Sequence, residues 1–397
     1  MINVAIIDYY DSAQFFFRLF KNRDEGDVII ITNLISVYML AKKNGFPARM
    51  LKNTSGKFQG CSLNKAREVI SCEISTNEAV KYANGIINEI EFLMRGYDSI
   101  RLLCWSGSDI KGAAIRYVKN KYGRGRVSSL FFEISNFPGY YFVDCLGVNA
   151  ESSAYLFPSY FLDDAEIISL ENSFGIMQSM INVKNRQKSL PQAGRSKKIT
   201  IRHFIDYGYM VIFGVKNFSF YSMFKRLVNK VRSRDLDISS YVNFNGELSD
   251  DNCFFPLQVS SDSQILLNYD GTLIDSLVEA VDWSHKLGKK LVVKLHPAET
   301  DVDCLEEIKR ICDQYGVLII DEQVASILSK VGSVVTVNST VGFEALLMGV
   351  DVKFLGRSQF SHLKCQRDVL LYIKSYIKEG DFFSGSPIEF PTILRCE

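Results

Sequence analysis

Short apolar runs alternate along this chain with longer segments whose apolar residues recur at helical spacing. In the first half the pattern predicts strands at 1–8, 28–32, 99–104 and 127–134, and helices at 33–43, 76–93 and 110–122. Asn33 is expected to cap the first of these helices, and Asn44 with Gly45 to end it. Strands that alternate with helices predict a parallel sheet with helices on both faces.

The same alternation is clearer in the second half. It predicts strands at 254–259, 290–295, 317–320, 333–337 and 351–355, separated by helices at 272–287, 303–315, 324–330 and 340–348. Strands and helices in this order are typical of a Rossmann-like domain. We therefore predict an α/β protein in which two Rossmann-like domains face a central cleft.

The chain has 397 residues, a length that favours two domains over one. We expect a first domain at 1–185, a linker with a basic and aromatic helical segment at 186–250, a second domain at 251–360, and at 361–397 a helix that packs back on the first domain. The linker is placed by residues 183–199, which carry several Lys and Arg but no acid, and which Pro191 and Gly194 interrupt.

Composition narrows the class of protein. The net charge of +1 gives no reason to expect a nucleic-acid partner. The nine cysteines stand singly, without a CxxC pair, which argues against a metal centre; their odd number and the lack of a basic leader predict a reducing cytoplasm. No apolar run is long enough to span a membrane. The aromatic and basic segment 207–234 is compatible with peripheral membrane contact, and also with a helix that has a core face and a solvated basic face.

Three polar clusters follow predicted strands of the second half, at 258–264, 294–297 and 338–346. Ligands of open α/β sheets bind outside the carboxyl ends of the strands. The clusters therefore predict one shared site.

His296 and Pro297 follow the strand 290–295, where a histidine can donate to a phosphate oxygen and a proline fixes the turn. Lys294 lies two residues earlier and points to the same side by strand alternation. A lone histidine is more often structural, so this assignment depends on the neighbouring clusters.

Asn338, Ser339 and Thr340 end a strand and open a helix, whose first N–H groups and hydroxyls form a seat for a phosphate. Glu344 follows, where its carboxylate can accept hydrogen bonds from ribose hydroxyls. Simple capping of the helix by Ser339 or Thr340 is compatible with the same residues.

Asp262 follows the strand 254–259 in a polar turn. A carboxylate there can act as a nucleophile or stabilise an oxocarbenium-like transition state, and Gln258 and Ser261 can orient a substrate. The simpler interpretation is a turn aspartate that bonds to its own backbone.

Glu133 ends a strand of the first half, where it could take a proton from an acceptor hydroxyl, or serve in a salt bridge or a helix cap. Asp144 and Asn149 lie in the polar stretch that follows. Either could bind an acceptor or a sugar, or shape a turn.

At these residues the chain resembles bacterial capsule polysaccharide biosynthesis proteins of the β-Kdo glycosyltransferase type, where Kdo is 3-deoxy-D-manno-oct-2-ulosonic acid. The resemblance covers about residues 131–153 and 254–356. It implies a GT-B fold with an acceptor-side first domain and a nucleotide-sugar-binding second domain. The His-Pro and Ser-Thr signatures are also similar to those of GT-B sialyltransferases, which use CMP-sialic acid.

By this resemblance His296, Ser339 and Thr340 hold the CMP of a CMP-Kdo donor, Glu344 contacts its ribose, and Lys294 and Asn338 belong to the same donor group. The family is thought to retain the β configuration, which makes Asp262 the nucleophile and Glu133 the base. Many members have an acidic triplet where this chain has Glu133-Ile134-Ser135. No cofactor or metal is expected, because the phosphodiester of a CMP-sugar carries its activation.

The resemblance further implies a glycan or lipid-linked acceptor in capsule or O-antigen synthesis, and a cytoplasmic enzyme at the inner face of the membrane. Three alternatives stay open: a sialyltransferase-like CMP-sugar transferase, a CDP-glycerol or CDP-ribitol phosphotransferase, and a non-catalytic scaffold. The occurrence of Asp262, His296, Ser339 and Glu133 in one pattern argues against the scaffold.

Overall fold

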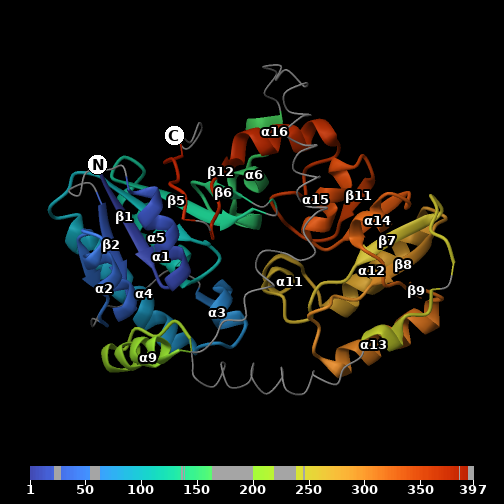
Figure 1. Ribbon diagram of the computed structural model, residues 1–397, viewed down its shortest axis with the longest axis horizontal. Helices are drawn as coiled ribbons and strands as arrows, with labels where there is room; N and C mark the ends of the chain where they lie inside the picture. The colour runs from blue at the N-terminus through green and yellow to red at the C-terminus, as the bar shows by residue number, and fades with distance from the viewer. Residues whose placement is uncertain are drawn as a thin grey trace. The chain divides into compact units, whose positions relative to one another are not determined.

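The computed structural model describes residues 1–21, 28–53, 63–135, 137, 139–162, 200–218, 238–244, 246–383 and 385–391. The chain forms two compact units, which Figure 1 draws with their elements labelled. One unit holds residues 1–156, 178–219 and 374–397, and the other holds 157–177 and 220–373, counting only the described residues within these ranges.

The first unit is built on a seven-stranded sheet with the order β12-β6-β5-β4-β1-β2-β3. Its strands are β1 (Ile2–Ile7), β2 (Val28–Thr32), β3 (Ala48–Met50), β4 (Ile100–Trp105), β5 (Val127–Ile134), β6 (Tyr140–Asp144) and β12 (Ile377–Glu379). Strands β1 to β5 run parallel, as predicted for β1, β2, β4 and β5, whereas β3 was not predicted. The prediction of a wholly parallel sheet is wrong at one edge, where β6 runs antiparallel to both β5 and β12. A short turn at Gly139, whose φ of +82° suits glycine, reverses the chain there.

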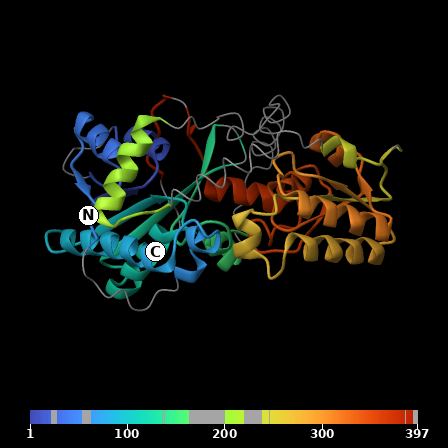
Figure 2. The ribbon, with the colours of Figure 1, turned by 90° about the horizontal axis from the view of Figure 1, so that it is seen from below.

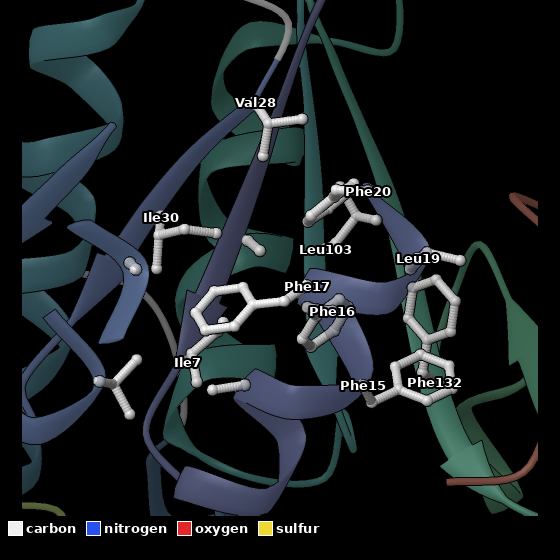
Figure 3. Packing of buried hydrophobic residues seen from close by; sticks show 14 of the residues in the cluster. Ile7, Phe15, Phe16, Phe17, Leu19, Phe20, Val28, Ile30, Leu103 and Phe132 are labelled. Carbon is white, nitrogen blue, oxygen red and sulfur yellow. The ribbon is translucent and has the colours of Figure 1, made fainter. Parts of the chain in front are cut away.

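Helices flank this sheet: α1 (Tyr10–Leu19), α2 (Ile35–Lys43), α3 (Arg67–Ile70), α4 (Thr76–Leu93), α5 (Ile110–Tyr122), α6 (Ser153–Leu156) and α9 (Ile201–Phe213). Aromatic residues of α1 fill the core on one face of the sheet, where Phe15 and Phe16 meet Phe132 of β5 (Figure 3). The tightly packed aromatic rings make this cluster costly to disrupt.

Asn33 does not cap α2, contrary to the sequence prediction. The helix begins at Ile35, and its N-cap Leu34 contributes no side-chain bond. The amide of Asn33 is buried and donates instead to the carbonyl of Val215, at 3.0 Å. A polar residue before a helix thus tethers the segment that follows α9.

The second unit is built on a five-stranded sheet, and all five strands predicted for it are present. They are β7 (Asn252–Pro256), β8 (Lys290–Lys294), β9 (Leu318–Ile319), β10 (Ser333–Thr336) and β11 (Asp351–Phe354), all parallel, in the order β11-β10-β7-β8-β9. The predicted helices also form, as α12 (Leu273–Lys286), α13 (Val302–Tyr315), α14 (Val324–Leu328) and α15 (Thr340–Leu347). A further short helix, α11 (Ser263–Asn268), was not predicted.

Strand alternation explains why helices cover both faces of this sheet. Phe255 and Val293 point to one side, where they pack with Leu277 and Ile308 of α12 and α13. Phe254 and Val292 point to the other side, into a cluster completed by α14 and α15. Successive strand residues face opposite ways, so a continuous apolar run serves two helix layers.

Each sheet has a switch point, where successive strands stop adding to one side of the sheet and begin to add to the other side. In the second unit, the chain proceeds from β7 through β8 to β9 on one side, then returns to β10 and β11 on the other. In the first unit the chain proceeds from β1 to β2 and β3 on one side, then returns to β4 and β5 on the other, so the switch point lies between β1 and β4. The carboxyl ends of β7 and β10, and of β1 and β4, are therefore the places where a ligand of this fold class binds.

The division of the chain differs from the predicted one at both ends of the second unit. Helix α9 belongs to the first unit rather than to a linker, and the basic residues 183–199 lie outside the described residues. The helix predicted near the C-terminus is α16 (Gln366–Tyr376); its Tyr372 packs against Phe343 and Phe360 of the second unit. It is strand β12 that joins the first unit, through β6.

Candidate active site

The polar clusters of the second unit meet at the ends of β7 and β10. The side chain of Gln258, which follows β7, donates from Nε2 to Asn338 Oδ1 at 3.0 Å and to Asp262 Oδ2 at 3.1 Å. The amide of Asn338 donates in turn to the carbonyl of Gln264, at 2.9 Å. Gln258 and Asn338 are both buried and both bonded to protein groups. We therefore assign them to positioning the site, rather than to the substrate contact expected of Gln258 or the donor contact expected of Asn338.

Asp262 is the N-cap of α11. It therefore bonds to the backbone of its own turn, as the simpler interpretation of the sequence states. Its Oδ1 accepts a hydrogen bond from the backbone N–H of Gln264 at 2.9 Å. Its Oδ2 receives the Gln258 amide, and the residue is partly exposed. A carboxylate held from two sides and still reachable keeps lone pairs for a substrate. Ser261, beside it, is exposed.

Glu299 braces the loop that carries Asp262, and no motif in the chain points to this residue. It is 4% exposed. Its Oε2 accepts from the backbone N–H of Ser260 at 2.7 Å, and its Oε1 accepts from the N–H groups of Thr300 and Asp301 at 2.8 and 2.9 Å. One carboxylate thus ties the loop after β7 to the loop after β8. A buried charge with these charge-assisted bonds fixes both loops at once.

His296, in the loop after β8, has a defined hydrogen-bonding state. Its Nδ1 accepts from the backbone N–H of Ala298 at 3.1 Å. Burial lowers its pKa, although the carboxylates of Asp262 and Glu299 act in the opposite direction. A neutral ring whose Nδ1 accepts must carry its proton on Nε2. The histidine therefore presents an N–H donor, as a phosphate-binding role requires.

Lys294 ends β8, and its ammonium pairs with the carboxylate of Asp321 at the end of β9. The lysine is mostly buried and the aspartate is exposed. The pairing places a cation at the same edge of the sheet as His296, with its charge partly compensated.

The start of α15 supplies the remaining donors. Ser339 is its N-cap and accepts from the N–H of Val341 at 3.2 Å, while Thr340 is the first residue of the helix. Glu344 lies one turn after Thr340 on the same side of the helix. Gly342 has a packing role: a Cβ there would lie 2.7 Å from the ring of Phe354 and 2.8 Å from Thr336. It lets α15 lie close on β10 and β11.

In the first unit, Glu133 and Asn149 are brought together. The amide of Asn149, a residue with φ of +53°, lies 3.5 Å from the Glu133 carboxylate. Burial raises the pKa of Glu133 to about 7, although the Asn149 contact acts in the opposite direction. A carboxyl group poised near neutral pH suits proton transfer.

Asp144 is not available to a ligand, and the turn interpretation is the correct one. It is 1% exposed, and its carboxylate accepts from the N–H groups of Leu146 and Ser153, at 2.7 and 2.9 Å, and from the Ser153 hydroxyl at 2.6 Å. These bonds fold the loop that presents Asn149.

The cluster at the ends of β1 and β4 is a network of opposite charges. Lys111 lies 2.5 Å from Asp8 and 2.7 Å from Asp109, and it is almost fully buried. Burial raises the pKa of neighbouring Glu68, and the charge of Asp109 acts in the same direction. The carboxylates of Asp8, Glu68 and Asp109 lie close enough together to hold a cation. Because the Lys111 ammonium already bonds two of them, we assign the network to stabilising the switch point of the first sheet.

Comparison of sequences places most of this chain in one family. The family described as capsule polysaccharide biosynthesis protein matches residues 111–374, which include both candidate acids and the whole donor group. No curated protein matches the sequence.

Comparison of structures gives the fold. A KpsC β-Kdo 2,7 transferase of Thermosulfurimonas dismutans is similar over 98% of this chain and 95% of its own, with 15% identity and a TM-score of 0.50. A KpsC β-Kdo 2,4 transferase from the same organism is similar over 73% of this chain and 84% of its own chain, with 16% identity and a TM-score of 0.43. The likeness to the 2,7 transferase extends over both Rossmann-like units, which confirms the predicted GT-B type of fold.

Proposed function

Because this chain belongs to the capsule polysaccharide biosynthesis protein family, we propose that it is a retaining β-Kdo glycosyltransferase. It moves Kdo from CMP-Kdo to a glycan or lipid-linked glycan of the bacterial surface, at the inner face of the cytoplasmic membrane. The observation that carries the proposal is the convergence of Asp262, His296 and the start of α15 on one edge of the second sheet.

The donor side is chemically suited to a phosphodiester. The Nε2–H of His296, the hydroxyls of Ser339 and Thr340, and the first N–H groups of α15 are all hydrogen-bond donors. Negative charge grows on the phosphate of CMP as the glycosidic bond breaks. Donors fixed in place before the reaction stabilise that charge without reorganising.

The reaction we propose has two displacements. The Asp262 carboxylate attacks the anomeric carbon of Kdo, the bond from that carbon to the phosphate oxygen breaks, and CMP leaves with the electron pair. An acceptor hydroxyl then attacks the same carbon, Glu133 takes its proton, and the ester to Asp262 breaks. Two inversions restore the β configuration, and the carboxylate is regenerated.

The test is donor choice combined with intact-protein mass. The purified chain is mixed with CMP-Kdo generated in situ, with CMP-sialic acid, or with CDP-glycerol. We expect CMP release only from CMP-Kdo, and a protein population heavier by one Kdo when no acceptor is present. Turnover of CMP-sialic acid or CDP-glycerol in place of CMP-Kdo would replace this proposal by the corresponding alternative.

Glu299 provides a prediction about positioning. Glu299→Ala removes the brace of the Asp262 loop, and we expect kcat to fall about 10- to 100-fold, because small misplacements of a reacting group are costly. The KM for CMP-Kdo should change less. The matched control is Glu307→Ala, an exposed glutamate of α13 that pairs with Arg310 and should leave kcat unchanged.

A different result would show that Glu299 only stabilises the fold. If the thermal midpoint drops while the folded fraction keeps the wild-type kcat, the residue stabilises the fold and does not position Asp262. Measuring kcat per folded molecule, from circular dichroism and steady-state rates on the same sample, separates the two outcomes.

A further inference from the structure

Helix α9 exposes an apolar face to solvent. Ile201, Phe204, Ile205, Val211 and Ile212 are 78%, 54%, 54%, 46% and 77% exposed. Their spacing over three turns places them on one side of the helix. Exposed aliphatic and aromatic side chains in one contiguous row are unusual on a soluble surface and mark an interaction site.

The opposite side of α9 packs firmly on the first unit, and these contacts fix which side of the helix faces solvent. Buried Asp206 accepts from the backbone N–H and the hydroxyl of Ser36 of α2, at 2.8 and 2.6 Å. Met210 is fully buried, and Tyr209 donates to the carbonyl of Leu51 at 3.1 Å. Figures 1 and 2 show α9, in yellow-green, at the edge of the first unit.

The surroundings of this face are positively charged. Exposed Lys42 and Lys43 end helix α2, which packs against α9, and exposed Lys52 lies over the ring of Phe213 at the end of α9. In the sequence from 172 to 234, Asp206 is the single acid, and it is engaged by Ser36. In the described part of that stretch, residues 200–218, the Lys and Arg residues are Arg202 on α9 and Lys216 shortly after it.

We propose that the α9 surface, defined as Ile201, Phe204, Ile205, Val211 and Ile212, docks on an anionic lipid bilayer. An apolar row flanked by bases has the chemistry of an interfacial helix, whose side chains enter the acyl boundary while the bases meet acidic headgroups. A second copy of this chain fits less well, because a symmetric contact would bring the same bases face to face. Among the described residues no helix is long and apolar enough to cross a membrane.

The proposal is independent of the sugar chemistry, and its test needs no substrate. The full chain is floated with vesicles of phosphatidylcholine alone, or of phosphatidylcholine mixed with an equal part of phosphatidylglycerol. We expect binding only to the anionic vesicles, and weaker binding at high salt. The double variant Ile205→Glu, Ile212→Glu should lose binding by on the order of 100-fold.

The matched control is Leu287→Glu, Val302→Glu, which adds the same charges at exposed apolar positions of the second unit and should bind as wild type. Circular dichroism confirms folding of both variants. Absence of binding to anionic vesicles, or binding equal in the α9 variant and the control, would overturn the proposal. A wild-type dimer in light scattering that the α9 variant abolishes, without vesicle binding, would assign the face to a second copy.

Discussion

Replacing Asp262 by asparagine is expected to lower Kdo transfer by about 10³-fold or more, because an amide cannot form the glycosyl ester. Asparagine caps helices as well as aspartate does, so α11 should keep its start and the loop should keep its fold. The amide oxygen can still accept from the Gln264 N–H, so the structural loss is confined to the hydrogen bond that Asp262 Oδ2 accepts from Gln258. The expected loss therefore belongs to chemistry rather than to structure, and the thermal midpoint should stay near that of wild type.

Two measurements make this result specific. Intact-protein mass should show the Kdo adduct in wild type and none in Asp262→Asn. Asp301→Asn is the matched control, because Asp301 is also an N-cap aspartate, on α13 of the same unit, and its side chain accepts from Cys304. Wild-type transfer by Asp262→Asn would show that another group, or a single displacement, carries the reaction.

The second unit could be predicted closely from the sequence because its central strands β7, β8 and β10 are largely buried on both faces. Each apolar run, such as 290–295, is bounded by polar or glycine residues, so that strand and helix starts are marked in the chain itself. The antiparallel edge of the first sheet carried no such mark. Strand β6 resembles any apolar run, and its direction depends on the short turn at Gly139 and on pairing with distant β12.

The position of the candidate site could be predicted from the sequence, but the hydrogen-bond partners of its residues could not. Strand ends placed Gln258, Asp262 and Asn338 at one edge of the sheet, where the structure finds them. The motifs assigned Gln258 and Asn338 to a ligand and left Asp144 open between a ligand and a turn. In the structure Gln258, Asn338 and Asp144 bond to protein groups, because a buried polar side chain must satisfy its own hydrogen bonds first.

Glu299 is a site residue whose role cannot be recognised from the sequence. It lies two residues after a His-Pro pair in a stretch of ordinary polar composition, and nothing in its spacing distinguishes it from exposed neighbours. Its importance comes from Ser260, which is 39 positions away in the chain and adjacent in the fold. Contacts of this kind depend on tertiary structure, which one sequence does not display.

Replacing Glu133 by glutamine should separate the two displacements. CMP release and formation of the Kdo adduct on Asp262 do not need a base, so both should persist in a single turnover. Transfer to the acceptor should fall by about 10²- to 10⁴-fold, because the acceptor hydroxyl is no longer deprotonated. The adduct should therefore accumulate in the variant even when acceptor is present, which intact-protein mass detects directly.

The pH dependence follows from the raised pKa of Glu133. With a pKa of about 7 the carboxyl group is protonated below neutrality, so wild-type transfer should fall as the pH drops through about 7. Glu133→Gln should lose that acidic limb. Stability should respond in the opposite sense: a carboxyl group whose pKa is higher in the folded than in the unfolded protein stabilises the fold at low pH, and loses that contribution as the pH rises through the folded value. At about pH 8 the glutamine variant should therefore be at least as stable as wild type.

The control for this prediction is Glu89→Gln, a glutamate of α4 in the same unit that pairs with Arg49 and should keep both the acidic limb and normal turnover of the adduct. If Glu133→Gln transfers Kdo at the wild-type rate with the same acidic limb, Glu133 is not the base. If instead the variant fails to form the adduct, Glu133 acts in the first displacement, and its proton serves the departing CMP rather than the acceptor. Either result would leave the donor site of the second unit as proposed, because none of its contacts passes through Glu133.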